Sequence, residues 1–151
     1  MARTLQRKPA DWVTIAGAEE TGDLVQFLMT PASALQHEIA LDRASAAARE
    51  LQESEEVRKA YGLDALQVAD IGDDGEALLG LSATLLATEL ALIVATELRG
   101  YLGEDGESPA RFDRRTIALV MQDWHTGQSM AQRFLLRALV PIYRSIEEGK
   151  S

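Results

Sequence analysis

The sequence predicts a mainly α-helical protein: a small helical bundle of about four helices with a short N-terminal β-hairpin. Three observations carry this prediction. Residues 77–96 are mostly apolar over the length of a long helix, and four of the five residues at 44–48 are alanine. After residue 129, apolar side chains recur at three- and four-residue spacing. A chain of 151 residues, 46% of them hydrophobic, fits a single domain over residues 1–151 with its own core. Its expected parts are a hairpin at about 11–29, a helical body at about 30–99, and a loop with C-terminal helices at about 100–149.

The first expected elements are the hairpin and a helix that follows it. Residues 12–15 and 24–29 are short runs of β-branched, aromatic and other apolar side chains, which is typical of paired strands. Thr30 and Pro31 have the pattern of a helix start, with the threonine as N-cap and the proline in the first turn. We expect this helix to run to about Lys59, and its alanines to let a second helix approach closely.

The second expected helix spans residues 76–99 and follows a Gly-Asp-Asp-Gly turn at residues 72–75. It is apolar almost all round, which is typical either of the central helix of a bundle or of a membrane span. Glu89 lies inside it, and a central carboxylate is costly in lipid. We therefore expect a buried helix and no membrane association.

Two further helices are expected near the C-terminal end. After a glycine-rich loop at residues 100–109, Asp113 is a good N-cap for a short helix that carries Trp124. The last helix is expected from about residue 129 to residue 148, with a kink at Pro141, which cannot donate a backbone hydrogen bond.

Charge is distributed unevenly along the chain. The formal net charge is −9, which repels phosphate backbones and argues against nucleic-acid binding. Residues 1–110 hold 8 basic and 20 acidic side chains, whereas residues 111–151 hold 7 basic and 4 acidic ones. The C-terminal part is therefore a distinct basic segment.

This basic segment contains the candidate partner-binding residues. Arginines recur there at helical spacing beside an apolar stripe, and the candidates are Arg133, Phe134, Arg137, Ala138, Ile142 and Arg144. One interpretation is a surface that steers an acidic partner. The other is a solvated helix face whose arginines pair with the chain's own carboxylates.

The sequence contains no set of residues that predicts catalysis, a metal or a cofactor. It lacks cysteine, and its two histidines, His37 and His125, are too few for a zinc site. Residues 75–82 have the spacing of a phosphate-binding loop, but Leu81 stands where the lysine is needed and also where an EF-hand loop needs a carboxylate. Glu89 is the one candidate for a raised pKa, and we favour a carboxylate at the edge of the buried face that is hydrogen-bonded to a neighbouring helix or to water. We therefore expect a non-enzyme without cofactors.

The order of these features resembles the phage tail assembly chaperone family. The N-terminal hairpin that leads into Thr30 and Pro31 is similar to the family's strand pair and "LTPLT-type" helix start. Residues 103–113, Gly-Glu-Asp-Gly-Glu-Ser-Pro-Ala-Arg-Phe-Asp, resemble its "W-x-G-x-x-D-E-x-G-x-P-x-x-F-T" loop. A short Ile/Leu-rich helix, a helix at about residues 134–143 and a Glu-Glu-Gly-Lys ending follow, as in many members.

The resemblance implies a small, mostly helical protein of tailed phages or gene-transfer particles that works in the host cytoplasm. Such proteins bind the long tape-measure protein and keep it soluble until tail-tube subunits polymerise around it, so the implied partners are the tape-measure protein and the tail-tube protein, with self-association as a further possibility. The alternative is a structural component of the virion, such as a head–tail adaptor, whose helices would form permanent ring contacts.

Overall fold

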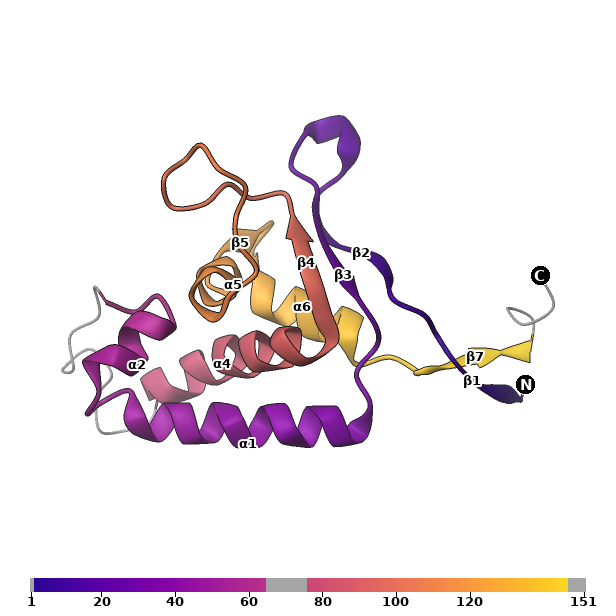
Figure 1. Cartoon of the computed structure of the whole chain (residues 1–151), viewed down its shortest axis with the longest axis horizontal. Coiled ribbons are helices and arrows are strands. Elements are labelled where there is room, and N and C mark those ends of the chain that lie inside the picture. Colours follow the sequence, from indigo (N-terminus) through magenta and orange to yellow (C-terminus); the bar gives the residue numbers. More distant parts are fainter. Residues whose placement is uncertain (1, 65–75, 147–151) are drawn as a thin grey trace.

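The computed structural model describes residues 2–64 and 76–146, with the backbone alone described for residues 76–80. In these residues the chain is an α+β protein with seven strands in three sheets and five α-helices (Figure 1). The expectation of a mainly α protein, a small helical bundle with one hairpin, is therefore wrong. The turn expected at residues 72–75 and the end of the last helix expected at residue 148 lie outside the described residues.

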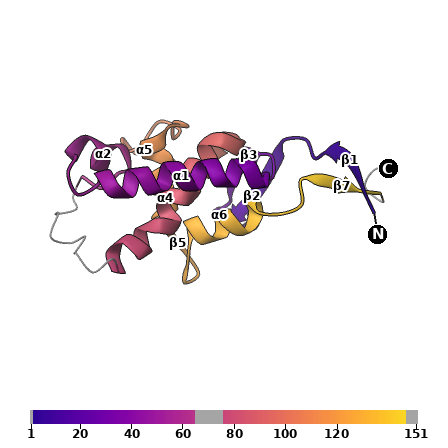
Figure 2. The same cartoon turned by 90° about the horizontal axis from the view of Figure 1, so that it is seen from below.

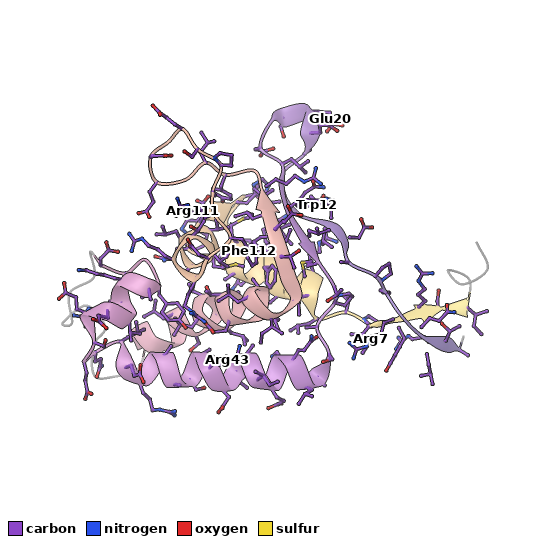
Figure 3. All side chains as sticks on the ribbon, in the orientation of Figure 1. Arg7, Trp12, Glu20, Arg43, Arg111 and Phe112 are labelled. Atoms are coloured by element: carbon purple, nitrogen blue, oxygen red, sulfur yellow. The ribbon has the colours of Figure 1, made fainter. Side chains whose placement is uncertain are left out.

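A three-stranded antiparallel sheet forms one side of the body. Its strands are β2 (Asp11–Ala16), β3 (Val25–Met29) and β4 (Ala95–Arg99), in the order β2-β3-β4. The β2–β3 hairpin confirms the predicted strand pair. The third strand comes from the segment that we expected to end the central helix, because Gln26 and Leu28 of β3 pair with Arg99 and Glu97. Trp12 lies on β2 (Figure 3). On the outer face of the sheet the Arg99 guanidinium lies over the Trp12 ring, 3.4 Å from its centre.

Helix α1 (Ala34–Glu50) begins later than expected. Its N-cap is Ser33, whose hydroxyl accepts a hydrogen bond from the Gln36 backbone while the Gln36 side chain accepts one from the Ser33 backbone. Thr30 is not the cap, because its N–H donates to the Val94 carbonyl (3.1 Å) and this keeps the chain extended beside the sheet.

The expected helix to Lys59 is divided into two helices. After α1, Leu51 is fully buried and the chain turns; α2 (Glu55–Ala60) then begins with Ser54 as its N-cap. The end at Tyr61 and Gly62 is confirmed, since Gly62 has φ +65, a left-handed conformation that glycine adopts without strain.

Helix α4 (Glu76–Val94) is the central helix of the body and lies against α1 (Figure 1). The contact uses small side chains of α1, because Ala40, Ala44 and Ala47 are all buried. This confirms the close helix approach that the alanines predicted. In the part of the chain that the structure describes, no helix is long and apolar enough to cross a membrane.

The two C-terminal helices are shorter than expected. Asp113 caps α5 (Arg114–Met121) as predicted, accepting a hydrogen bond from the Thr116 backbone (2.8 Å). Helix α6 (Met130–Ala138) starts at the expected place, with Ser129 as N-cap, but ends before Pro141 and is not kinked by it. Residues beyond it run to β7 (Tyr143–Ser145), a strand where a helix was expected.

Strand β7 pairs with β1 (Arg3–Arg7), which the sequence did not predict, to form a two-stranded antiparallel ribbon. This terminal ribbon extends away from the body, and Arg7 lies on it apart from the helices (Figures 2 and 3). Its base is tied by a hydrogen bond from the Lys8 backbone to the Ile142 carbonyl (2.9 Å).

Trp124, expected in a helix, lies instead in a small hairpin of β5 (Trp124–His125) and β6 (Gln128–Ser129). Its two turn residues, Thr126 and Gly127, both have positive φ, at 49° and 80°, as a two-residue type I′ turn requires.

The turn gives a first testable prediction. A β-branched residue is strained at positive φ, whereas asparagine tolerates it, so Thr126→Asn should raise the free energy of unfolding by about 0.5–1 kcal/mol. Urea denaturation measures this change. Gly127→Ala serves as the opposite control, because it places a side chain at φ 80 and should destabilise. An unchanged midpoint for Thr126→Asn would contradict the strained turn.

Candidate functional site

Helix α6 is held in place by its apolar face. Met130, Ala131, Phe134 and Ala138 are buried in the main core, which α6 shares with the inner face of the sheet and with α4 and α5. The ring of Phe134 meets that of Phe27 edge to face, with 5.2 Å between their centres. The opposite face of α6 is left without a covering element within the described residues, and exposes Leu136 and Leu139.

The six candidate partner-binding residues therefore divide into two groups. Phe134 and Ala138 are fully buried, so they stabilise the core and are not on the surface. Arg133, Arg137, Ile142 and Arg144 are half-buried or exposed. They do not share one helix face as expected, because Arg144 lies in β7, yet Arg137 and Arg144 line the same groove. Their role in partner binding stays a prediction.

The arginines differ in what they contact. Arg133 donates from Nε to the Ile15 carbonyl (2.8 Å) and from Nη1 to Oε1 of Gln128 (3.3 Å), which fixes α6 to β2. Arg137 and Arg144 form no hydrogen bond or ion pair through their side chains with any residue in 2–64 or 76–146. Within that part of the chain, the interpretation that these arginines pair with the chain's own carboxylates is not supported.

The exposed face of α6 borders an apolar hollow of about 350 Å³. We call this the α6 surface; its residues are Gln128, Gln132, Leu135, Leu136 and Leu139. Leu136 is 66% exposed and Leu139 47% exposed. Two leucines exposed side by side, rimmed by neutral amides, form the kind of apolar face that packs against a partner helix.

A groove with charged walls runs beside it, between α6 and strand β2. We call this the α6–β2 groove; its larger part, of about 560 Å³, is lined by Lys8, Pro9, Asp11, Val13, Met29, Pro31, Arg137, Val140 and Arg144. A smaller part, of about 190 Å³, is lined by Ile15, Gln128, Arg133, Leu136 and Arg137. Arg137 lines both parts, and Leu136 also belongs to the α6 surface. The hollows of the groove and of the α6 surface are therefore neighbours that share lining residues.

Trp124 is a further exposed apolar residue near this helix. It is 68% exposed on the β5–β6 hairpin, which leads directly into α6. Asp123 anchors the hairpin: its side chain accepts hydrogen bonds from the Tyr101 hydroxyl (2.6 Å) and the Trp124 backbone (2.8 Å), and its carbonyl accepts one from the Met130 backbone (2.9 Å). Tryptophan is enriched among the residues that contribute most to binding at protein interfaces, so an exposed Trp124 on an anchored hairpin is a further candidate for partner contact.

Comparisons of the chain with protein-family models, with curated proteins and with solved structures found no match. The functional interpretation therefore rests on the residues and on this geometry.

Glu89, the candidate for an unusual carboxylate, is part of a buried ion pair. Its side chain is 2% exposed and accepts hydrogen bonds from Arg114 Nε (2.8 Å) and Nη2 (3.1 Å) and from the Tyr61 hydroxyl (2.6 Å). Burial by itself raises the pKa of Glu89, but the hydrogen bonds from Arg114 and Tyr61 and the charges of Arg114 and Arg43 outweigh it, so its pKa is lowered. The expectation of a raised pKa is wrong, and the favoured hydrogen bonding to a neighbouring helix is confirmed, although the carboxylate is fully buried and not at the edge of the buried face.

This ion pair is a structural contact between helices. Tyr61 follows α2, Glu89 lies in α4 and Arg114 begins α5, so one carboxylate joins three elements. Burial and the Glu89 carboxylate raise the pKa of Tyr61, which keeps its hydroxyl protonated as a donor. The Glu89 carboxylate is ionised and both of its oxygens already accept hydrogen bonds, so it is poorly suited to act as a general acid or base.

A second arginine, Arg115, ties the glycine-rich loop to the body. It binds Asp64 and Glu104 through paired hydrogen bonds and donates to the Lys59 carbonyl (2.7 Å). Among the residues with described positions, no group of three or more histidine or carboxylate side chains could hold a metal ion.

Sequence reasoning located α6 but missed three parts of the candidate site. Lys8 lies in the groove at the base of the β1–β7 ribbon, where its backbone donates to the Ile142 carbonyl, and Asp11 is placed there by the pairing of β2 with Met29 of β3. Trp124 was assigned to the short helix after Asp113, and the signal for the hairpin that contains it is weak, because Gly127 favours a two-residue turn but Thr126 does not.

Proposed function

We propose that this protein is a tail assembly chaperone of tailed phages or related gene-transfer particles. It binds apolar helical segments of the tape-measure protein in the host cytoplasm and keeps them soluble until the tail tube forms. It acts by binding and carries out no catalysis. The resemblance of residues 103–113 to the family loop, and the exposed leucines of the α6 surface, support this proposal.

The observation that carries the proposal is the uncovered apolar face of α6. An unassembled tape measure is expected to be long, helical and apolar on one face, and such a helix is recognised by an apolar groove or face of similar width. Leu136 and Leu139 are positioned for this contact because the core holds the opposite side of the same helix rigidly. The net charge of −9 favours solubility of the loaded complex.

The test is co-expression with a tape-measure fragment. The double variant Leu136→Glu/Leu139→Glu should weaken binding at least about tenfold, because each buried leucine contributes about 1.5–3 kcal/mol and a tenfold change corresponds to about 1.4 kcal/mol. The soluble yield of the fragment should fall with it. Leu102→Glu is the matched control, since Leu102 is 58% exposed but lies on the loop before α5.

The protein content of purified particles separates this proposal from the structural alternative. A chaperone is absent from finished particles, whereas a head–tail adaptor is present in them in fixed stoichiometry. Equal soluble yields with the wild type and with Leu136→Glu/Leu139→Glu would show that the α6 surface is not the binding site.

A further inference from the structure

The α6–β2 groove has a charge opposite to that of the whole chain. Three cations, Lys8, Arg137 and Arg144, line its larger part, and Asp11 is the one carboxylate among the described residues there. Its smaller part adds Arg133 and no described carboxylate. The formal net charge of the chain is −9, so this local excess of positive charge is not a reflection of composition.

The hollow beside the loop before α5 has no such excess of positive charge. Its two arginines face three carboxylates. The charged residues that line it are Glu104, Asp105, Arg111, Asp113 and Arg115. Arg115 forms ion pairs with Glu104, which lines the same hollow, and with Asp64, which lies outside it. In the α6–β2 groove, by contrast, Arg137 and Arg144 have no such partner in the described parts of the chain.

The groove is also lined by apolar residues, among them Pro9, Val13 and Val140. A bound segment would therefore meet hydrocarbon as well as positive charge. Charges beside apolar groups in a groove are less screened by water than charges on an open surface, which strengthens their attraction for a carboxylate.

We propose that the α6–β2 groove binds an acidic segment of the same protein partner whose apolar residues pack on the α6 surface. This inference rests on the proposed function and adds a rule for the partner sequence. Because Arg137 lines both parts of the groove and Leu136 belongs to both the groove and the α6 surface, the partner carries a block of carboxylates next to a block of apolar residues.

A protein segment fits this groove better than a nucleic acid does. A nucleic acid that extended from the groove along β2 would approach the carboxylates of the β2–β3 connection, where Glu20 lies (Figure 3). A short carboxylate block meets the cations alone, and its apolar neighbours gain from burial.

The test uses three labelled helical peptides and the full chain. The first has a leucine-containing block next to a glutamate block, the second has glutamines in place of the glutamates, and the third has the composition of the first with its residues interspersed. Fluorescence anisotropy measures the dissociation constant of each peptide. At low salt the first peptide should bind at least about tenfold tighter than the other two. This difference in affinity should shrink at 0.5 M salt, because the screening length falls to a few ångströms.

Variants of the chain test whether the preference for the glutamate peptide depends on the arginines of the α6–β2 groove. Arg137→Gln/Arg144→Gln should remove the preference for the first peptide over the second, whereas the matched pair Arg49→Gln/Arg111→Gln, exposed arginines outside the groove, should keep it. Circular dichroism verifies that both double variants are folded.

The outcomes separate this inference from the proposed function. Equal binding of the glutamate and glutamine peptides, or of the blocked and interspersed peptides, would overturn the acidic-segment inference and leave the α6 surface intact. So would equally effective competition by a single-stranded oligonucleotide. Binding of every peptide that is insensitive to Leu136→Glu/Leu139→Glu would instead overturn the proposed use of the α6 surface.

Discussion

Phe134→Ala should lower the free energy of unfolding by about 3–5 kcal/mol, because truncating a fully buried phenylalanine loses its burial and leaves a cavity in a close-packed core. The loss of the edge-to-face contact with Phe27 adds to this cost. Chemical denaturation of the purified chain measures the change. The expected result assigns Phe134 to stability, although its position beside the arginines suggested a partner contact.

His37→Ala is the control for this experiment. The His37 side chain is only half-buried, so its truncation should change stability by no more than about 0.5 kcal/mol. Ile142→Ala, also at a half-buried position, should fall between the two. A Phe134→Ala chain that keeps wild-type stability but loses partner binding would contradict the buried position of the ring.

Glu89→Ala should cost about 3 kcal/mol of stability. Removing one partner of a buried ion pair costs about 3–5 kcal/mol in general, and the lower end applies because the Arg114 side chain is 45% exposed and can be hydrated. The Tyr61 hydroxyl also loses its acceptor. Glu97→Ala is the matched control, since Glu97 is an exposed carboxylate on β4 and should change stability little.

The same ion pair predicts a dependence on pH. The folded pKa of Glu89 is lowered from 4.5, so its contribution is complete above pH 4.5 and is lost as the pH falls through the lower, folded pKa. The stability difference between the wild type and Glu89→Gln should therefore shrink below pH 4.5. A difference that stays constant down to pH 3 would show that Glu89 is not held as a carboxylate.

The elements that the sequence predicted well are those with local signals. The β2–β3 hairpin, the end at Tyr61 and Gly62, the cap at Asp113 and the helix start near residue 129 depend on residues within a few positions of one another. The partners of Glu89 could not be named, because Tyr61 and Arg114 lie 28 and 25 residues away along the chain.

The elements that it missed depend on distant partners. Residues 95–99 have no strong strand pattern. They form a strand because the backbone N–H and C=O groups at the free edge of β3 need hydrogen-bond partners, and this segment supplies them. Likewise β1 and β7 are strands only because the two ends of the chain pair with each other. These pairings turned a predicted helical bundle into an α+β fold.

The candidate site shows the same division. The amino-acid sequence by itself determined that α6 is amphipathic and that its segment is basic, because both follow from spacing and composition along a few turns. Tertiary structure alone decided which of its residues face the core, and it brought Lys8, Arg137 and Arg144 to one groove. The physical reason is that burial and long-range strand pairing are properties of the whole packed chain, whereas helix caps and periodicity are settled within a single segment.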